Sequence, residues 1–435
     1  MMKRREMIKI GGLAVLTTGF GRGIFAQTGQ AVGDAPLKNM VGDVKPLDAA
    51  DYAARVEKAR RLLASNRLDA LFLEAGTNLR YFTGVSWWRS ERAFGVVLSP
   101  KKDAVWVCPA FERHRAEELI PKGQEVRVWE EDESPYALIA GTLKDLGAAG
   151  GRLAVDPSLP AFVFFGLRGA APSLELIDGS GVTDTCRGTK SAKEIAYMDL
   201  ANKITKLAFR DAFVRLREGM TTRELASVIS GALQQMGVSG GAGPEFGPNT
   251  AFPHGSTAAR NIRPGDAVLA DGGCSVEGYA ADVTRTVFFG RPTEKQQRVW
   301  EVVERAQMAA LEAARPGAAC EAVDRAARRV VEEAGFGPGY KFFTHRVGHG
   351  IGMEGHEYPY LVRGNTLKLE PGMTFSNEPG IYIHDEFGVR IEDCMVITEE
   401  GARFLGGLEA TAVDRPFGAS PMGERPQEGG RYETS

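Results

Sequence analysis

Two stretches of this 435-residue chain decide its fold: IRPGDAVLADGG at 262–273 and LEPGMTFSNEPG at 369–380. In each stretch a Pro-Gly turn leads into an apolar run, and an acid stands six residues after the glycine: Asp271 in the first and Glu378 in the second. A Pro-Gly turn before a short apolar run predicts a buried strand. Recurrence of the turn, the strand and the acid together indicates an internal duplication.

The helices that precede these stretches repeat in the same way. One predicted helix lies between Gly219 and Gly237 and another between Gly317 and Gly335, and both spans are eighteen residues long. Glycine is frequent just beyond helix ends. A long amphipathic stretch at 192–216 opens this region. We therefore predict an α+β domain at 189–410, built from two helix-helix-β units with pseudo-two-fold symmetry.

Each half also carries a second acid. Asp282 follows Asp271 by eleven residues, and Glu392 follows Glu378 by fourteen. We expect all four acids at strand ends, where a buried carboxylate is costly unless it is paired or bound to a metal. Arg390, two residues before Glu392, can neutralise only part of that charge. Acids arranged in this way in two similar halves predict a cation site.

The stretch THRVGHGIGMEGHEYP, at 344–359, places three histidines among glycines. His349 is the expected nitrogen ligand, because glycines on both sides let the backbone approach the site closely. His345 lies four residues earlier, but the run between them is β-like or irregular, so the paired-ligand spacing of a helix does not apply. His356, and His254 in FPHGST, become candidates for holding substrate or stabilising an oxyanion beside the metal.

The ligand types indicate which ions would bind. A carboxylate-rich cage with one imidazole favours hard or borderline divalent ions: we expect Mn²⁺, with Co²⁺, Fe²⁺ and Zn²⁺ as alternatives. The predicted acids are more than one ion normally needs. Two ions about 3.5 Å apart, bridged by shared carboxylates and a water, would use them all.

Residues 47–187 show a different pattern. Helical periodicity from Tyr52 to Leu63 leads into a strand-like run at 68–75, and further strand-like and helical runs alternate up to about Cys186. Such alternation predicts an α/β domain with a largely parallel or mixed sheet. The five cysteines are too widely spaced for a metal-binding or disulfide pattern. A net charge of −3 without large single-sign blocks argues against a nucleic-acid partner.

The two ends of the chain differ from both domains. Residues 1–30 place Arg4 and Arg5 before a short apolar run, which predicts a twin-arginine-type export signal and a periplasmic location. No later segment has 18 uninterrupted apolar residues, so we expect no stable membrane insertion once the signal is removed. Residues 416–435, rich in Gly, Pro, Glu and Arg, are predicted to be disordered.

The motifs around the acids resemble those of a known family. GHGIG surrounds His349, NEPGIY surrounds Glu378 and VRIED surrounds Glu392, in order after Asp271 and Asp282. This set resembles the creatinase/prolidase-type metallopeptidases, which have the pita-bread fold. The family includes Xaa-Pro dipeptidases, Xaa-Pro aminopeptidases and methionine aminopeptidases.

A second motif narrows the resemblance to one branch of that family. NLRYFTG, at 78–84, resembles the N-terminal domain of prolidases, which the simple methionine aminopeptidases lack. The resemblance implies a dipeptidase or aminopeptidase that cleaves Xaa-Pro bonds in short proline-containing peptides, and it suggests a homodimer. A bond before proline has no N–H, so a site built around metal ions and a shaped proline pocket suits it.

The resemblance also implies a role for each ligand of two divalent ions per subunit. Asp271 would chelate one ion, Asp282 and Glu392 would bridge both, and His349 and Glu378 would complete the shell of the other. Glu378 would in addition receive the proton of the bridging water as it attacks the scissile carbonyl, and pass it to the leaving nitrogen.

Other residues of the site would act on the substrate or on the ligands. His356 would stabilise the tetrahedral intermediate and His254 would contact the substrate. Arg390 would steady Asp271, in keeping with the general role of residues that orient metal ligands. His345 is expected to be a further pocket residue.

Two other functions are compatible with the sequence. The same dinuclear scaffold could serve a hydrolase or lyase acting on a non-peptide small molecule, although creatinase itself lacks the metal set. A non-catalytic binding module is disfavoured, because such relatives have usually lost ligands and none is missing here. The loop WWRSERAFG, at 87–95, departs from the prolidase pattern in its paired tryptophans, and could line a substrate pocket or pack within the N-terminal domain.

Overall fold

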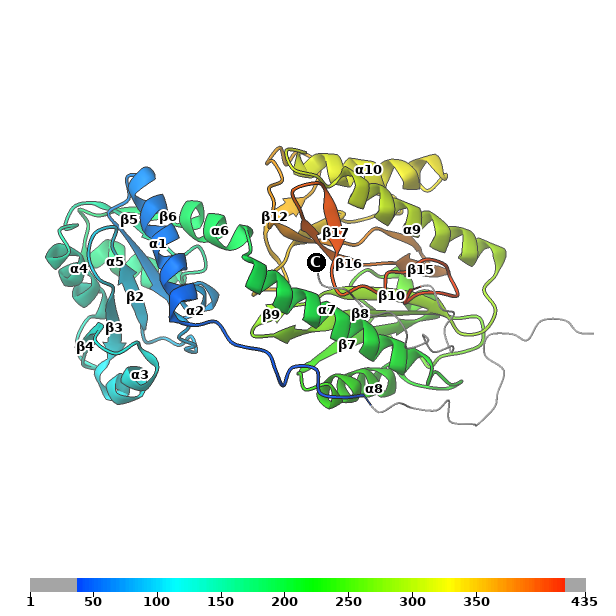
Figure 1. Cartoon of the computed structure of the whole chain (residues 1–435), viewed down its shortest axis with the longest axis horizontal. Helices are drawn as coiled ribbons and strands as arrows, with labels where there is room; N and C mark the ends of the chain where they lie inside the picture. Colours follow the sequence, from blue (N-terminus) through cyan, green and yellow to red (C-terminus); the bar gives the residue numbers. More distant parts are fainter. Residues whose placement is uncertain (1–36, 419–435) are drawn as a thin grey trace, which may run out of the picture.

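The computed structural model describes residues 37–418, which form two domains lying side by side (Figure 1). The chain passes from the first to the second through α6 (Ser180–Gly188) and the long helix α7 (Ala192–Phe213). The predicted export signal, and residues 419–435 of the predicted tail, lie outside the described residues. Within 37–418, no helix combines the length and the apolar character needed to cross a membrane.

The N-terminal domain is a six-stranded mixed sheet in the order β4-β3-β2-β1-β5-β6, covered by helices on both faces. Strand β2 is antiparallel to both of its neighbours and the other pairs are parallel, which confirms the predicted α/β domain. The other elements of this domain are α1 (Ala49–Ser65), β1 (Ala70–Glu74), α2 (Thr77–Thr83), β2 (Gly95–Leu98), β3 (Val105–Pro109), η1 (Ala110–Glu112), α3 (Arg113–Leu119), β4 (Glu125–Trp129), α4 (Pro135–Asp145), β5 (Arg152–Val155), α5 (Ala161–Ala170) and β6 (Glu175–Asp178).

Helix α1 begins where its sequence supplies a cap. The Asp48 side chain accepts hydrogen bonds from the backbone N–H groups of Ala50 and Asp51, and the Asp51 carboxylate accepts from the N–H of Asp48. This reciprocal capping satisfies N–H groups that a helix leaves unpaired at its start. One face of the helix then buries Ala59 and Leu63 in the core beneath the sheet.

The C-terminal domain contains the two predicted units. After α7 its elements are α8 (Thr222–Gln235), β7 (Gly240–Phe246), η2 (Gly247–Ala251), β8 (Ala267–Val276), β9 (Tyr279–Ala280) and β10 (Val283–Phe288) in the first half. The second half contains α9 (Glu294–Ala313), α10 (Cys320–Glu333), β11 (Gly348–Gly350), β12 (Glu357–Leu361), β13 (Thr374–Asn377), β14 (Gly380–Ile383), β15 (Phe387–Arg390), β16 (Asp393–Ile397) and β17 (Ala402–Phe404).

The topology of the two halves confirms the duplication. Strand β8 is antiparallel to β7 on one side and β10 on the other, and β13 is antiparallel to β11 and β16 in the same manner. Helices α7 and α8 bury their apolar faces against the first sheet, while α9 and α10 pack with the second. The two predicted helices between glycines are α8 and α10.

Two details of the prediction are wrong. Asp271 does not end a strand: β8 continues to Val276, because it pairs with β7 along its length and then with β9. Residues Pro416 and Phe417, assigned to the disordered tail, are packed instead. Phe417 is 5% exposed, and the Pro416 carbonyl accepts a hydrogen bond from Arg285 Nε at 2.7 Å.

Buried charges join the two domains. Arg55 of α1 pairs with Glu194 of α7 at 2.9 Å and donates to the Tyr279 hydroxyl at 2.7 Å. Arg187, at the end of α6, contacts Glu357 at the start of β12. The two ion pairs and the tyrosine are all 8% exposed or less, so water screens these contacts little.

Candidate metal centre

The sheets of the C-terminal domain bring the five predicted ligands together. They are Asp271 within β8, Asp282 just before β10, His349 in β11, Glu378 just after β13 and Glu392 just before β16. Their side chains form overlapping groups in which the ligand atoms lie within 4.8 Å of one another. Glu392 belongs to two of these groups, one with Asp271 and Asp282 and one with His349 and Glu378. The cluster therefore has the donors and the shared carboxylate that a pair of divalent ions requires.

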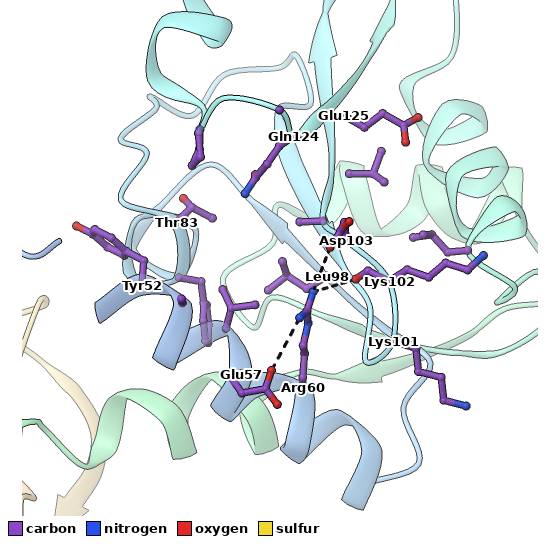
Figure 2. Close-up of a pocket in the computed structure, with 18 of the residues that line it drawn as sticks. Tyr52, Glu57, Arg60, Thr83, Leu98, Lys101, Lys102, Asp103, Gln124 and Glu125 are labelled. Carbon is purple, nitrogen blue, oxygen red and sulfur yellow. Dashed lines mark hydrogen bonds and ion pairs between the residues drawn. The ribbon is translucent and has the colours of Figure 1, made fainter. Parts of the chain in front are cut away.

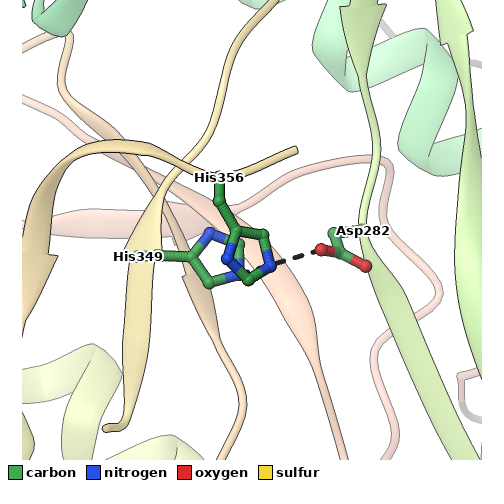
Figure 3. Close-up of side chains that lie close together, drawn as sticks. All are labelled: Asp282, His349 and His356. Carbon is green, nitrogen blue, oxygen red and sulfur yellow. Dashed lines mark ion pairs between the residues drawn. The ribbon is translucent and has the colours of Figure 1, made fainter. Parts of the chain in front are cut away.

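The glycines beside His349 allow the strands to approach. A Cβ added to Gly348 would lie 2.0 Å from the Ser376 carbonyl oxygen, so no larger residue fits there without displacing β13. His349 Nδ1 faces the Gly350 carbonyl oxygen at 3.1 Å, which leaves Nε2 for the cluster. That nitrogen lies 3.3 Å from Glu378 Oε1 and 3.8 Å from Asp282, as the dashed line in Figure 3 marks for the second pair.

The pKa values of the acids show that the positively charged side chains of the protein do not balance the negative charge of the cluster. Burial, followed by repulsion from Asp271 and Glu378, raises the pKa of Asp282 well above its usual range. Burial and the charge of Asp282 do the same to the pKa of Glu392. Burial also raises the pKa of Glu378 to about 7. Carboxyl groups that share a buried space in this way are stabilised as anions when cations join them.

Arg390 compensates only one of these acids closely. Its Nη2 donates to Asp271 Oδ2 at 2.7 Å, whereas its Nε lies 4.0 Å from Glu392 Oε2. Other donors of the same guanidinium bond the Thr284 hydroxyl at 3.0 Å and the Pro253 carbonyl at 3.0 Å. This arginine therefore fixes the orientation of one carboxylate. Other cations are needed to balance the charge of the remaining acids.

The three other histidines predicted for the site have different surroundings. His345 bonds the Tyr382 hydroxyl through Nε2 at 2.8 Å, and burial followed by the charge of Arg390 lowers its pKa to about 3. The ring of His356 stacks on that of His349, with 3.7 Å between centroids (Figure 3). His356 also lies in a group with Asp282 and His349 whose ligand atoms are within 4.8 Å.

His254 is exposed on the loop that follows η2 and belongs to none of the close groups found among residues 37–418. Burial, then the charges of Arg346 and His254, lowers the pKa of His356, which places His254 on the same side of the site. The adjacent Pro253 carbonyl accepts from Arg390 Nη1, so the loop is tied to the cluster.

Sequence reasoning missed three hydroxyl groups that support the ligands. Thr284 donates to Glu392 Oε2 at 2.6 Å, Ser376 donates to Glu378 Oε1 at 3.1 Å, and the Tyr382 hydroxyl accepts from Arg390 Nη1 at 2.9 Å. The spacing of Ser376, two residues before Glu378, was a usable signal, because residues two apart on a strand face the same side. Thr284 could not be found in this way, since its partner lies 108 residues away.

The N-terminal domain holds a separate groove of about 1520 Å³ (Figure 2). Its charged groups largely satisfy one another: Arg60 donates to the Lys102 carbonyl and lies within 4.0 Å of Glu57 and Asp103. No predicted site residue lines it.

The tryptophan loop packs within the N-terminal domain of this chain. Trp87 stacks on Phe94 at 4.1 Å and on Trp88 at 4.9 Å, and Arg115 lies over the Trp88 ring at 4.3 Å. Within the chain these contacts are packing contacts, and Trp88 is 48% exposed.

The fold and the cluster define a class of protein: a two-domain metalloenzyme whose ligands come from both halves of a duplicated α+β domain. The chain belongs to metallopeptidase family M24, whose model matches residues 196–399, and residues 55–188 match the Creatinase/Prolidase N-terminal domain. It is therefore a metallopeptidase with the pita-bread catalytic domain, from a family that uses divalent metals.

Similar proteins cover nearly the whole of both domains. The Xaa-Pro dipeptidase of Lactobacillus helveticus is 36% identical over 80% of this chain and 95% of the relative. The crystal structure of dipeptidase PepE from Mycobacterium ulcerans superposes with a TM-score of 0.78 at 34% identity, covering 83% of this chain and 96% of the other. The prolidase of Thermococcus sibiricus gives a TM-score of 0.75 at 32% identity, with 82% and 97% covered.

Proposed function

We propose that this metallopeptidase cleaves the Xaa-Pro bond of dipeptides. The observation that supports the proposal is the convergence of all five ligand side chains, with ligand atoms within 4.8 Å in each group, in a chain 36% identical to an Xaa-Pro dipeptidase. Dipeptidases and prolidases also stand among the similar solved structures.

The ligand groups suggest how two ions would be shared. Asp271 and Asp282 would hold one ion, His349 and Glu378 the other, and Glu392 would bridge them, because it lies in both groups. Asp282 would also contact both ions, since its carboxylate lies 3.8 Å from His349 Nε2. Divalent ions held there polarise a carbonyl and lower the pKa of bound water, which supplies a nucleophile at neutral pH. We propose Mn²⁺ as the metal on the grounds of its ligand preference.

Glu378 has the properties of the proton acceptor. Its carboxylate belongs to the ligand group with His349 and Glu392, so it would lie within reach of a water held by the ions, and it could take a proton from that water and give it to the leaving proline nitrogen. The Ser376 hydroxyl donates to Oε1 and fixes the carboxylate plane, while Oε2 lies 3.8 Å from His345 Nδ1. His356, whose ring stacks on that of His349, would donate to the oxyanion of the tetrahedral intermediate. His254 would contact the peptide from its exposed loop.

The experiment is an assay of the metal-reconstituted full chain on Xaa-Pro dipeptides, Xaa-Pro-Yaa tripeptides and non-peptide amides. We expect cleavage of the dipeptides, and loss of that cleavage in Glu378→Gln. Cleavage of tripeptides in preference to dipeptides would instead show an aminopeptidase. Turnover of non-peptide substrates alone would support the small-molecule hydrolase or lyase, and would overturn the proposal.

We also propose that the chain is exported through its twin-arginine-type N-terminus and acts as a homodimer. The first rests on Arg4 and Arg5 before a short apolar run. Large apolar side chains on the N-terminal domain, such as Phe111 at 62% exposure and Trp88 at 48%, offer surface that a second copy could cover. Light scattering of the purified chain tests the assembly, and a monomeric mass would exclude it.

A further inference from the structure

The loop that carries His356 contacts the N-terminal domain through Met353, which packs on its core, and through the buried guanidinium of Arg187. Arg187, the penultimate residue of α6, is 8% exposed and extends from the N-terminal core toward this loop. Its Nη2 contacts Glu357 and donates to Glu354 Oε2 at 3.0 Å. Buried guanidinium-carboxylate contacts are strong and directional, so they fix the positions of both partners.

Glu357 has side-chain and backbone contacts besides the one with Arg187. Lys190 Nζ donates to its Oε1 at 2.7 Å, and that oxygen lies so close to Gly352 that an added Cβ would meet it at 2.5 Å. The backbone of Glu357 pairs with Gly350 between β11 and β12, at the register shift that follows His349. The residue directly after His356 is therefore fixed through both its side chain and its backbone.

His356 depends on this anchor because little else orients it. The residue is exposed, its ring stacks on His349, and no hydrogen bond found among residues 37–418 involves its imidazole. Stacked rings adopt a range of offsets, so the stack alone does not fix where the imidazole stands. The backbone of the loop must then set where the imidazole stands relative to the metal ligands.

The other end of the anchor lies deep in the N-terminal domain. Arg187 Nη1 donates to Asn78 Oδ1 at 3.0 Å, and Asn78 Nδ2 donates to Asp156 Oδ1 at 3.0 Å. Asn78 is 4% exposed and Asp156 1% exposed. A continuous line of buried contacts thus runs from the end of β5, through α2 and α6, to the loop of His356.

We propose that Arg187 is a positioning residue, which holds His356 in its working place by clamping Glu357, and that the N-terminal domain is in this way part of the catalytic machinery. The inference rests on the proposed function for the role of His356. It assigns to Arg187 an effect on the rate of the chemical step, separate from the general docking of the two domains.

The test compares Arg187→Met with Arg55→Met. Arg55 is the matched control, because it forms the other buried ion pair between the domains, with Glu194, and does not contact the His356 loop. Each variant is made in the full metal-loaded chain, alone and combined with His356→Ala, and kcat and KM are measured on an Xaa-Pro dipeptide. The combination with His356→Ala forms a double-mutant cycle, which reports whether one residue acts through the other.

We expect Arg187→Met to lower kcat about 10- to 100-fold, with KM within about threefold and an unchanged metal content. In the His356→Ala background the same change should leave kcat within about twofold, because its target is gone. Arg55→Met should lower the melting temperature without a comparable loss of kcat. Equal losses of kcat for Arg187→Met with and without His356 would overturn the proposal, as would an equal loss in Arg55→Met.

Amide hydrogen exchange of residues 351–358 adds a measurement that does not need activity. We expect exchange there to quicken about tenfold or more in Arg187→Met and to stay unchanged in Arg55→Met. Unaltered exchange in Arg187→Met would refute the anchor. If the wild type cleaves no Xaa-Pro bond, the proposed function fails, while the exchange result still decides on the anchor. If Arg187→Met does not fold, Asn78→Ala, which removes a neutral tether and keeps the charges, is tested with the same expectations.

Discussion

Replacement of Arg390 by lysine separates the geometry of the metal centre from its charge. The arginine donates to Asp271 Oδ2 at 2.7 Å, to the Thr284 hydroxyl at 3.0 Å, to the Tyr382 hydroxyl at 2.9 Å and to the Pro253 carbonyl at 3.0 Å. A lysine ammonium keeps the positive charge, but a single nitrogen cannot reach partners spread around a planar fork. The Asp271 carboxylate then loses the contact that fixes its rotamer.

The expected cost follows from that one contact. A hydrogen bond to a charged group contributes about 1.5 to 3 kcal/mol, and about 1.4 kcal/mol corresponds to a factor of ten in affinity. Arg390→Lys should therefore weaken metal binding about 10- to 100-fold, which is the range found for residues that orient metal ligands. Arg390→Met would confound the result, because it removes a positive charge that itself opposes cation binding.

Isothermal titration of the chelator-stripped protein with Mn²⁺, at a pH above 7, measures the effect. Arg55→Lys serves as the control, since Arg55 is as buried but lies between the domains. A metal affinity of Arg390→Lys within about threefold of the wild type would refute the reasoning, because it would mean that Asp271 holds its place without the arginine. Loss of the Pro253 contact should also raise KM, through the loop of His254.

Four further outcomes are expected. Glu378→Gln should lower kcat about 100- to 10,000-fold in protein that still folds, and retained activity would exclude it as proton acceptor. Burial raises the pKa of Glu378 to about 7 and the pKa values of Asp282 and Glu392 well above their usual range, so metal binding must expel protons from these acids. Affinity should therefore fall by about tenfold or more per unit between pH 7 and 6, and a flat titration series would contradict this. Gly348→Ala, whose Cβ would lie 2.0 Å from a carbonyl oxygen of β13, should destabilise the fold by about 1 to 3 kcal/mol in denaturant unfolding, whereas Gly355→Ala, with nothing within 4 Å, should not. Arg4→Lys with Arg5→Lys should retain the chain in the cytoplasm of an exporting host, and normal export of that variant would rule out the twin-arginine route.

The convergence of the five predicted ligands could be predicted because these residues lie in local patterns that repeat. The turn, the strand and the acid recur at equal spacing around Asp271 and Glu378, and each is a short-range signal that survives without knowledge of the fold. The glycines around His349 were also informative. The facing strand leaves no room for a Cβ, as the 2.0 Å approach at Gly348 shows.

The errors came from contacts between distant segments. Gly272 and Gly273 look like the end of a strand, but an added Cβ at Gly273 would lie 2.0 Å from the Ala281 carbonyl oxygen, so the pair permits close packing inside a strand that continues. Likewise Phe417 belongs to a polar segment by composition, yet its ring lies 5.9 Å from that of Phe213. Tertiary burial overrides local propensity in both places.

Comparison of the two halves shows which residue of the first half corresponds to His349. His349 faces Ser376, the fourth residue after Gly372, since Gly350 pairs with Phe375. The fourth residue after Gly265 in the first half is Leu269, and its partner on β7 is Glu245.

Glu245 therefore occupies the position that corresponds to His349, and its carboxylate contacts the loop of His254. Its Oε1 accepts from the Ser256 N–H at 2.9 Å and lies where a Cβ on Gly255 would meet it at 2.6 Å. The loop that it holds carries His254. Corresponding strand positions thus carry a proposed metal ligand in one half and a residue that supports a neighbouring loop in the other. If the proposed roles of His349 and His254 hold, divergence of that kind gives a symmetric fold a metal side and a substrate side.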